Sequence, residues 1–269
     1  MPRNRRSVFR VRKDMIKPGV VTLLVVFTGG LPSMAAENEG GRVPVLLELF
    51  TSEGCSSCPP ADRLLQLFDQ RQPVANANLI VLSEHVDYWD RLGWKDPFSS
   101  PQFTIRQQDY ADRYSREGVH TPQLVVDGRF ALVGSDSREA NAAIQKAARE
   151  PKVAMALSNA IRDGKELKAH IDVAGAVNAK KRSAVLYVVI ADDRAESQVA
   201  RGENAGRSLS HVAVIRVLKE AATIDLRGAV SRDVVLTVPA GAGVNGLRLV
   251  AFLEDPGSGH ILGAAVLKL

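Results

Sequence analysis

The stretch that decides the fold reads ELFTSEGCSSCPP over residues 48–60, and it holds the only two cysteines of the chain, Cys55 and Cys58. Two small polar residues separate them, so a disulfide between them would close a short ring that thiolate exchange can reopen. The apolar run 43–50 precedes the pair, and a helical pattern follows it. The sequence therefore places a candidate redox centre at a strand-to-helix turn.

The segments on either side of this turn predict a strand–helix–strand unit. The runs 43–50 and 79–82 are apolar almost throughout, which is typical of strands covered on both faces. Between them, apolar residues recur at i, i+3, i+4 and i+7 from Ala61, the spacing of one helix face.

Further elements are expected after residue 84. An insertion over residues 84–118, rich in aromatic and charged residues, includes a predicted helix that begins near Ser100. The Asp-Gly pair at 127–128 lies between two apolar runs and predicts a hairpin. Asp136, with Glu139 three residues later, predicts a capped helix. We therefore expect an α/β domain with a helical insertion over residues 42–150.

The composition changes at Lys152 to short strand-like runs separated by turns. Alternating apolar residues and Asp-Gly or Pro-Gly turns are typical of antiparallel strands. This half predicts a mainly β, sandwich-like C-terminal domain over residues 152–269.

The first 36 residues have the layout of an export signal and its cleavage region. A basic stretch is followed by the apolar run 19–27, then by helix breakers and small residues. The run is shorter than the ~20 apolar residues of a membrane span, so we expect no stable span after cleavage. The expected location is periplasmic or secreted, where a cysteine pair can persist as a disulfide. The export route and an uncleaved anchor stay open.

The net charge of the chain is set by this segment. Residues 1–35 hold seven basic residues and one acidic residue, so they contribute +6 to the net charge of +5 and leave −1 for the remainder. A chain with this balance has no sequence signal for a nucleic-acid partner.

The position of the cysteines predicts different roles for them. Free N–H groups and the dipole at a helix N-terminus stabilise a thiolate. Cys55, nearer the turn, is expected to be the exposed nucleophile, and Cys58 the buried resolving thiol. Pro59 and Pro60 fit the first turn of a helix, which indicates that the helix begins near Cys58.

Two other interpretations of the pair stay open. An inert disulfide is one, although so small a loop constrains the unfolded chain little. A copper(I) site formed by Cys55, Cys58 and His85 is the other, since soft thiolates favour that ion. A structural zinc site would need two further ligands, and the chain has no second cysteine pair.

With Thr121-Pro122 ahead of the hairpin, this order of elements resembles the thioredoxin fold. The resemblance implies that Pro122 follows a cis peptide bond and faces the cysteine pair. It also implies that Thr121 offers its backbone to a substrate peptide.

A closer likeness covers nearly the whole mature chain. The motifs LFTSEGCSSCPPA (49–61), HVDYWD (85–90) and RGENAGR (201–207) are similar to those of an uncharacterised family of secreted bacterial proteins. Members of that family have a thioredoxin-like N-terminal half. The likeness implies a thioredoxin-like α/β domain followed by a second domain, and leaves the substrate open.

Several polar and aromatic residues could shape the site. His85 or Asp87 could tune the thiol, because perturbing partners cluster near reactive groups, and Trp89 could line a substrate groove. His85 could equally be a hydrogen-bonded structural residue. Trp94 is interpreted as part of a small hydrophobic core formed within the insertion itself. The glycine-punctuated segment 201–211 either folds over the cysteine half or is a solvated loop.

The function we predict is an exported thiol-disulfide oxidoreductase. It would act on protein or small-thiol substrates or on a redox partner protein, with the Cys55–Cys58 disulfide as its redox group and no bound cofactor. A copper(I)-handling protein and a non-catalytic binding module on the same scaffold are the alternatives.

Overall fold

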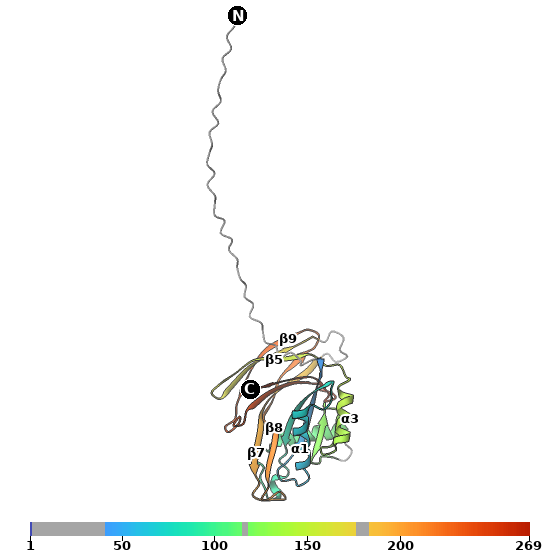
Figure 1. The fold of residues 1–269 in the computed structure, drawn as a ribbon, viewed down its shortest axis with the longest axis vertical. Helices are drawn as coiled ribbons and strands as arrows, with labels where there is room; N and C mark the ends of the chain where they lie inside the picture. The colour runs from blue at the N-terminus through green and yellow to red at the C-terminus, as the bar shows by residue number, and fades with distance from the viewer. Residues whose placement is uncertain (2–40, 115–117, 176–182) are drawn as a thin grey trace. The chain divides into compact units, whose positions relative to one another are not determined.

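The computed structural model describes Met1 and residues 41–114, 118–175 and 183–269 (Figure 1). The chain divides into two units, Met1–Ser33 and Met34–Leu269, and every element below belongs to the second. Apart from Met1, the predicted export signal lies outside the described residues. In the described part of the chain, no helix is long and apolar enough to cross a membrane.

Strands dominate the structure. The strands are β1 Val43–Thr51, β2 Ala77–His85, β3 Gln123–Val126, β4 Phe130–Val133, β5 Met155–Asp163, β6 Glu166–Val173, β7 Ser183–Gln198, β8 Ser208–Asp225, β9 Val230–Thr237, β10 Leu247–Glu254 and β11 Ile261–Lys268. The helices are α1 Pro59–Arg71, α2 Pro101–Tyr114, α3 Ser137–Ala147 and the 3-10 turn η2 Asp90–Leu92.

Eight strands form one mixed sheet in the order β11-β10-β7-β8-β2-β1-β3-β4. β1 runs parallel to β2 along its whole length, from Val43 opposite Ala77 to Thr51 opposite His85. β8 is parallel to β2 and pairs with it at Ser83 and Val214. The other neighbours in the sheet are antiparallel. Strands from both halves of the sequence therefore share one sheet.

The predicted fold, a thioredoxin-like α/β domain with a helical insertion followed by a β-rich domain, is wrong. The described chain is mainly β, and its mixed sheet continues from β4 through β2 and β8 to β11. The physical reason lies at the free edge of β2, where unpaired N–H and C=O groups need partners. β8 supplies them from more than a hundred residues away, which no local pattern shows. The boundaries at 42–150 and 152–269 stay a prediction.

Side chains alternate along β1, and this sends neighbouring residues to opposite faces of the sheet. Thr51 faces α1, where its hydroxyl donates to Asp62 at 3.0 Å. Glu48 faces α2, where Arg106 Nε donates to it at 2.7 Å. The two helices therefore cover opposite faces of β1.

A buried polar cluster lies under α2. We call Glu48, Glu84, Arg106, Tyr110 and Glu254 the Arg106 cluster; all five are buried. Arg106 also donates to Glu254 on β10 at 2.9 Å, and the hydroxyl of Tyr110 donates to Glu48 at 2.7 Å. The cluster ties the first strand of the sheet to the C-terminal half.

A second layer covers the C-terminal side of the large sheet. It is the three-stranded sheet β5-β6-β9, labelled in part in Figure 1. Its apolar residues, such as Leu157 and Ile171, pack into one core with alternate residues of β7 and β10, such as Leu186 and Leu249. The remaining strand residues, such as Val189 and Val250, belong to the core shared with the helices.

Several local predictions are confirmed. Asp127 and Gly128 both have positive φ, 59° and 62°, and join β3 to β4 as the Asp-Gly pair predicts. The Asp136 side chain accepts from the backbone amides of Arg138 and Glu139 at the start of α3.

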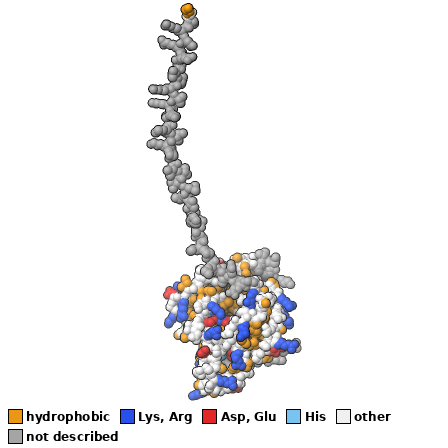
Figure 2. All heavy atoms as spheres, viewed as in Figure 1, with side chains coloured by type: hydrophobic (Ala, Val, Ile, Leu, Met, Phe, Trp, Pro, Cys, Tyr) orange, Lys and Arg blue, Asp and Glu red, His pale blue; other side chains and the backbone are white. Residues whose placement is uncertain are grey.

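The viewed surface in Figure 2 carries Lys and Arg side chains at several separate places.

Candidate functional site

The cysteines lie in the turn between β1 and α1 and are joined by a disulfide. Cys58 is the N-cap of α1, and the two prolines hold its first positions. Proline suits these positions because the first amides of a helix have no partner inside it. The predicted place of the pair, and the helix start near Cys58, are confirmed.

The prediction that Cys55 is exposed is wrong. Cys55 and Cys58 are both 0% exposed, whereas Ser56 and Ser57 between them are exposed. The burial of Cys58 agrees with its predicted position. A segment from the other half of the sequence packs on the cysteine turn and binds the backbone carbonyl of Cys55.

This segment is the capping loop, which we define as residues 199–207 between β7 and β8. It closes on itself: the amide of Val199 donates to the carbonyl of Arg207 at 3.0 Å, and the amide of Gly206 donates to Val199 at 2.7 Å. Inside it, the amide of Ala205 donates to Gly202 at 3.1 Å. The loop is therefore organised by its own hydrogen bonds.

Two side chains of the capping loop bind the backbone of the cysteine turn. Asn204 is fully buried, and its Nδ2 donates to the carbonyls of Glu53 and Cys55, both at 2.9 Å. The carboxylate of Glu203 accepts from the amide of Ser56 at 3.0 Å. Hydrogen bonds from Ser56 hold the pKa of Glu203 below its usual value. Of the two interpretations of segment 201–211, folding over the cysteine half is confirmed.

Trp89 connects the cysteine turn to the Thr121-Pro122 segment. Its indole Nε1 donates to Thr121 Oγ1 at 2.8 Å. A Cβ added to Gly54 would lie 3.4 Å from Trp89 Cβ, an ordinary van der Waals distance, so Trp89 packs against the turn at this residue. The peptide bond between Thr121 and Pro122 is cis, as the resemblance implied. The structure thus brings Trp89 beside the cysteine turn and Thr121.

Glu53 is a buried carboxylate two residues before Cys55, and three elements converge on it. Trp94 Nε1 donates to its Oε2 at 2.7 Å, and Ser197 at the end of β7 donates to its Oε1. His211 Nε2 lies 3.6 Å from the same Oε1. The interpretation that Trp94 belongs only to a core within the insertion is therefore wrong, because its indole N–H binds Glu53 in the cysteine turn.

His211, on β8, lies between two carboxylates that flank the cysteines in sequence. Its Nδ1 is 3.6 Å from Asp62 on α1, and its Nε2 is 3.6 Å from Glu53. Burial by itself would lower the pKa of this imidazole, but Asp62 first and then Glu53 raise the pKa to about 10. A pKa this high favours the imidazolium at neutral pH, between two residues that flank the cysteine motif in sequence.

His85 completes this group, which we call the His211 cluster: Glu53, Asp62, His85, Asp96 and His211. His85 Nδ1 is 2.7 Å from Asp96 Oδ2, and the imidazole centroids of His85 and His211 lie 4.7 Å apart. Burial would raise the pKa of Asp96, but the charge and hydrogen bond of His85 hold it below the usual value. A role for His85 in tuning the thiol stays a prediction.

Asp87 serves another part of the molecule. Its carboxylate accepts from the hydroxyl of Thr104 at 2.6 Å, and its amide donates to the same hydroxyl at 3.2 Å. Asp87 therefore fastens the segment after β2 to the first turns of α2.

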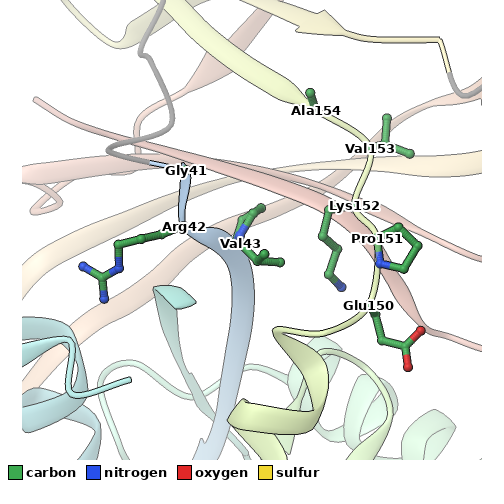
Figure 3. A pocket seen from close by; sticks show the side chains of 9 residues that line it. Gly41, Arg42, Val43, Glu150, Pro151, Lys152, Val153 and Ala154 are labelled. Atoms are coloured by element: carbon green, nitrogen blue, oxygen red, sulfur yellow. The ribbon is translucent and has the colours of Figure 1, made fainter. Parts of the chain in front are cut away.

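A hollow of about 230 Å³ opens at the other end of β1 (Figure 3). Residues 41–44 and 150–154 line it, and the Lys152 ammonium binds Asp127 and the carbonyl of Ile261. Because β1 begins at this hollow and ends at the cysteine turn, the hollow lies apart from the candidate site.

A copper(I) site at Cys55, Cys58 and His85 stays a prediction. Within the part of the chain that the structure describes, no group of three or more His, Cys, Asp or Glu residues has an arrangement that could hold a metal ion.

A disulfide at a helix start, covered by a loop and backed by an imidazolium, defines the site of a mainly β protein with a mixed sheet. The chain belongs to the family described as "Protein of unknown function (DUF1223)", whose model matches residues 46–254. This match confirms the likeness to an uncharacterised family and does not extend to the thioredoxin superfamily. No curated protein matches the sequence.

Two solved structures share the fold over most of the chain. Protein AGR_C_4864 from Agrobacterium tumefaciens is 26% identical, with a TM-score of 0.62 over 84% of this chain and 94% of its own. HBP35 of Porphyromonas gingivalis is 13% identical, with a TM-score of 0.63 over 85% of this chain and 76% of its own. The second likeness shows the fold alone.

Sequence reasoning missed the residues that surround the disulfide from a distance. Glu53 stood inside the cysteine motif, and His211 at the end of the glycine-punctuated segment, yet neither was assigned a role. A usable signal for both was a charged or titratable residue next to apolar residues, because such a residue needs a polar partner when it is buried. Asn204, Asp62 and Asp96 carried no comparable signal.

Proposed function

We propose that the protein is a thiol-disulfide oxidoreductase that uses Cys55 and Cys58. The observation that carries the proposal is a disulfide of two cysteines three residues apart at the start of α1, with the buried side chain of His211 between Glu53 and Asp62 on either side of the cysteine motif. A ring this small adds little to stability by restricting the unfolded chain, so a purely structural role explains it poorly.

The exchange chemistry balances in two steps. A substrate thiolate attacks Cys55 Sγ, so that a substrate–Cys55 disulfide forms while the bond to Cys58 breaks and Cys58 leaves as a thiolate. A second substrate thiolate then attacks the substrate sulfur, which forms the substrate disulfide and releases Cys55 as a thiolate. The substrate dithiol loses two electrons and the protein disulfide gains them. The reverse sequence oxidises the protein dithiol and reduces a substrate disulfide.

One feature of the helix favours a thiolate at this turn. The dipole of α1 is positive at its start, where the cysteines lie. Free amides do not add to it, because Pro59 and Pro60 have no N–H and the amides of Ala61 and Asp62 donate to the carbonyl of Cys58. His211 offsets part of the negative charge of Glu53 and Asp62, which would otherwise disfavour a thiolate nearby.

We also propose that the protein works outside the cytoplasm, in the periplasm or after secretion. The layout of residues 1–36 supports this, because a basic start, an apolar run and a small-residue site are typical of export signals. An oxidising compartment would keep the disulfide in the state seen here. A fusion of residues 1–36 to a reporter active only after export tests this proposal.

A trapping experiment tests the redox function. In Cys58→Ser, the thiolate of Cys55 attacks a substrate disulfide and forms a mixed disulfide that Cys58 is no longer present to resolve. We expect covalent adducts through Cys55 when the variant is incubated with a disulfide-containing unfolded protein. Dithiothreitol should release them.

Cys55→Ser is the matched control, because it keeps one thiol at the same turn. Cys58 is the N-cap residue of α1 and the assigned resolving thiol, so this variant should give far fewer adducts. Equal adduct formation by the two variants would contradict the assigned order of attack. The absence of adducts in both would contradict the function.

A further inference from the structure

The capping loop satisfies backbone groups that the cysteine turn would otherwise leave without partners. The carbonyls of Glu53 and Cys55 accept from Asn204 Nδ2, and the amide of Ser56 donates to the Glu203 carboxylate. Buried backbone groups without partners are costly. A ligand that displaces the loop retains these hydrogen bonds if it offers N–H donors to the two carbonyls and an acceptor to the exposed amide of Ser56.

We propose that the capping loop occupies the place of the substrate, and that the substrate is an extended polypeptide segment carrying a cysteine. This inference rests on the proposed redox function and names its substrate class. A polypeptide carries both N–H donors and C=O acceptors, and it can replace the partners that Asn204 and Glu203 provide. A small thiol cannot, so it gains less from opening the loop.

Burial supports the need for displacement. Both cysteines are 0% exposed, so an attacking sulfur reaches Cys55 Sγ only after a neighbouring segment moves, and the capping loop is a segment that binds the Cys55 carbonyl. Within the capping loop only Val199 and Asn204 are buried, and the other seven residues are exposed. The loop buries little apolar surface, so we expect a low free energy for its local opening.

Geometry supports movement of the loop as a unit. Its internal hydrogen bonds join Val199 to Arg207 and to Gly206, and they do not involve the cysteine turn. β7 and β8 are paired up to Gln198 and Ser208, next to the loop. The loop can therefore leave the turn without breaking the sheet.

Charge gives the loop a second effect. The Glu203 carboxylate accepts the hydrogen bond of the Ser56 amide, which lies in the turn where a thiolate would form. A negative charge near the turn disfavours the thiolate that exchange requires. Displacement by a neutral peptide carbonyl removes that charge, so substrate binding would also activate the cysteines.

The test compares two reductants on the intact protein. The rate at which the Cys55–Cys58 disulfide is reduced is followed by quenching with an alkylating agent and mass spectrometry. The reductants are dithiothreitol and an unstructured peptide with two cysteines, at equal thiolate concentration. The variants are Asn204→Ala and Glu203→Gln, with Asn141→Ala as control because Asn141 is a half-buried residue of α3 whose side chain donates to the carbonyl of Ser137.

We expect Asn204→Ala to speed reduction by dithiothreitol about tenfold, because the closed loop loses the hydrogen bonds of Asn204 Nδ2 to the cysteine turn. Glu203→Gln should speed it about threefold, and Asn141→Ala should not change it. The peptide rate should rise less in both loop variants, so the ratio of peptide rate to dithiothreitol rate should fall. Glu203 is exposed, so its variant keeps the test valid if Asn204→Ala fails to fold.

Two results would overturn the inference, and they differ from a failure of the function. Unchanged dithiothreitol rates in both variants would show that the loop does not control access. Equal acceleration of reduction by both reductants would show that the capping loop only blocks access to the disulfide and does not imitate a bound peptide. In either case exchange itself would persist, whereas a disulfide that neither reductant opens in any folded variant would overturn the proposed function as well.

Discussion

Two buried polar clusters flank β1, and they hold their charges in different ways. In the Arg106 cluster the guanidinium makes direct hydrogen bonds of 2.7 and 2.9 Å to Glu48 and Glu254. In the His211 cluster the imidazolium lies 3.6 Å from both carboxylates. Within the described residues, neither nitrogen of His211 makes a hydrogen bond.

The difference distinguishes a side chain that links several elements by direct hydrogen bonds from one whose longer contacts can change more easily. Arg106 joins α2 to strands from both ends of the sequence, and its partners are fixed in direction by its planar donors. His211 lies at longer distances, 3.6 Å from Glu53 and from Asp62, two residues that flank the cysteine motif. We expect changes in the first cluster to act on stability, and changes in the second to act on stability and on the cysteines together.

The largest effect is expected from Arg106→Met, which breaks the Arg106 cluster. It leaves Glu48 and Glu254 buried without their cation, so the free energy of unfolding should fall by about 3–5 kcal/mol. Denaturant unfolding measures this. Arg113→Met is the control, since Arg113 is partly exposed and 3.6 Å from Glu254, and should cost about 1 kcal/mol or less. A loss below about 1 kcal/mol for Arg106→Met would contradict the role of this cluster as a fastening.

His211→Gln should give the next largest effect, and it depends on pH. The pKa of His211 is raised to about 10 in the folded protein, so its charge contributes stability that is fully present below about pH 6.5. That contribution is lost as the pH rises from about 6.5 through about 10. The difference in unfolding free energy between wild type and variant, a few kcal/mol at pH 6, should therefore shrink by pH 10. A difference that does not vary with pH would show that His211 is uncharged, which would remove the contrast with Arg106.

Glu84→Gln sharpens the comparison with an effect of opposite sign. Burial first and then the charge of Glu48 raise the pKa of Glu84 well above its usual value. A raised carboxyl pKa costs stability as the pH rises above about 4.5, because the unfolded chain ionises there first. The variant should lose this pH dependence and be at least as stable as wild type at pH 7. If wild type and variant keep parallel stability curves from pH 4 to 8, Glu84 is ionised in the fold.

The smallest effect is expected from Trp94→Phe, which removes one hydrogen bond to Glu53. Stability should fall by about 1 kcal/mol. Because Glu53 also faces His211, the pKa of His211 measured by NMR titration should shift, whereas Arg106→Met should leave it unchanged. Identical imidazole titrations in wild type and Trp94→Phe would separate Glu53 from the His211 cluster.

The sequence predicted the elements whose causes are local. The apolar run of β1, the Asp127-Gly128 turn and the Asp136 cap depend on neighbours a few residues away, and each was predicted correctly. The position of the cysteines at a strand-to-helix turn followed from the same patterns.

The joining of the halves could not be predicted in this way. β8 meets β2 at the single pair Ser83 and Val214, and an apolar strand carries no mark of which edge it will join. The contact between the capping loop and the cysteine turn has the same origin, because Asn204 binds the Cys55 carbonyl from the segment between β7 and β8. Contacts between residues far apart in the sequence therefore account for the error in the fold and for the covered cysteine turn.

The measurement that tests the account most directly is the redox equilibrium of Cys55–Cys58 with glutathione. A disulfide that exchanges with substrates should equilibrate at a reduction potential between about −120 and −270 mV, the span of known thiol-disulfide oxidoreductases. The account predicts a reversible equilibrium in that range. A potential below about −300 mV, typical of structural disulfides, would contradict it.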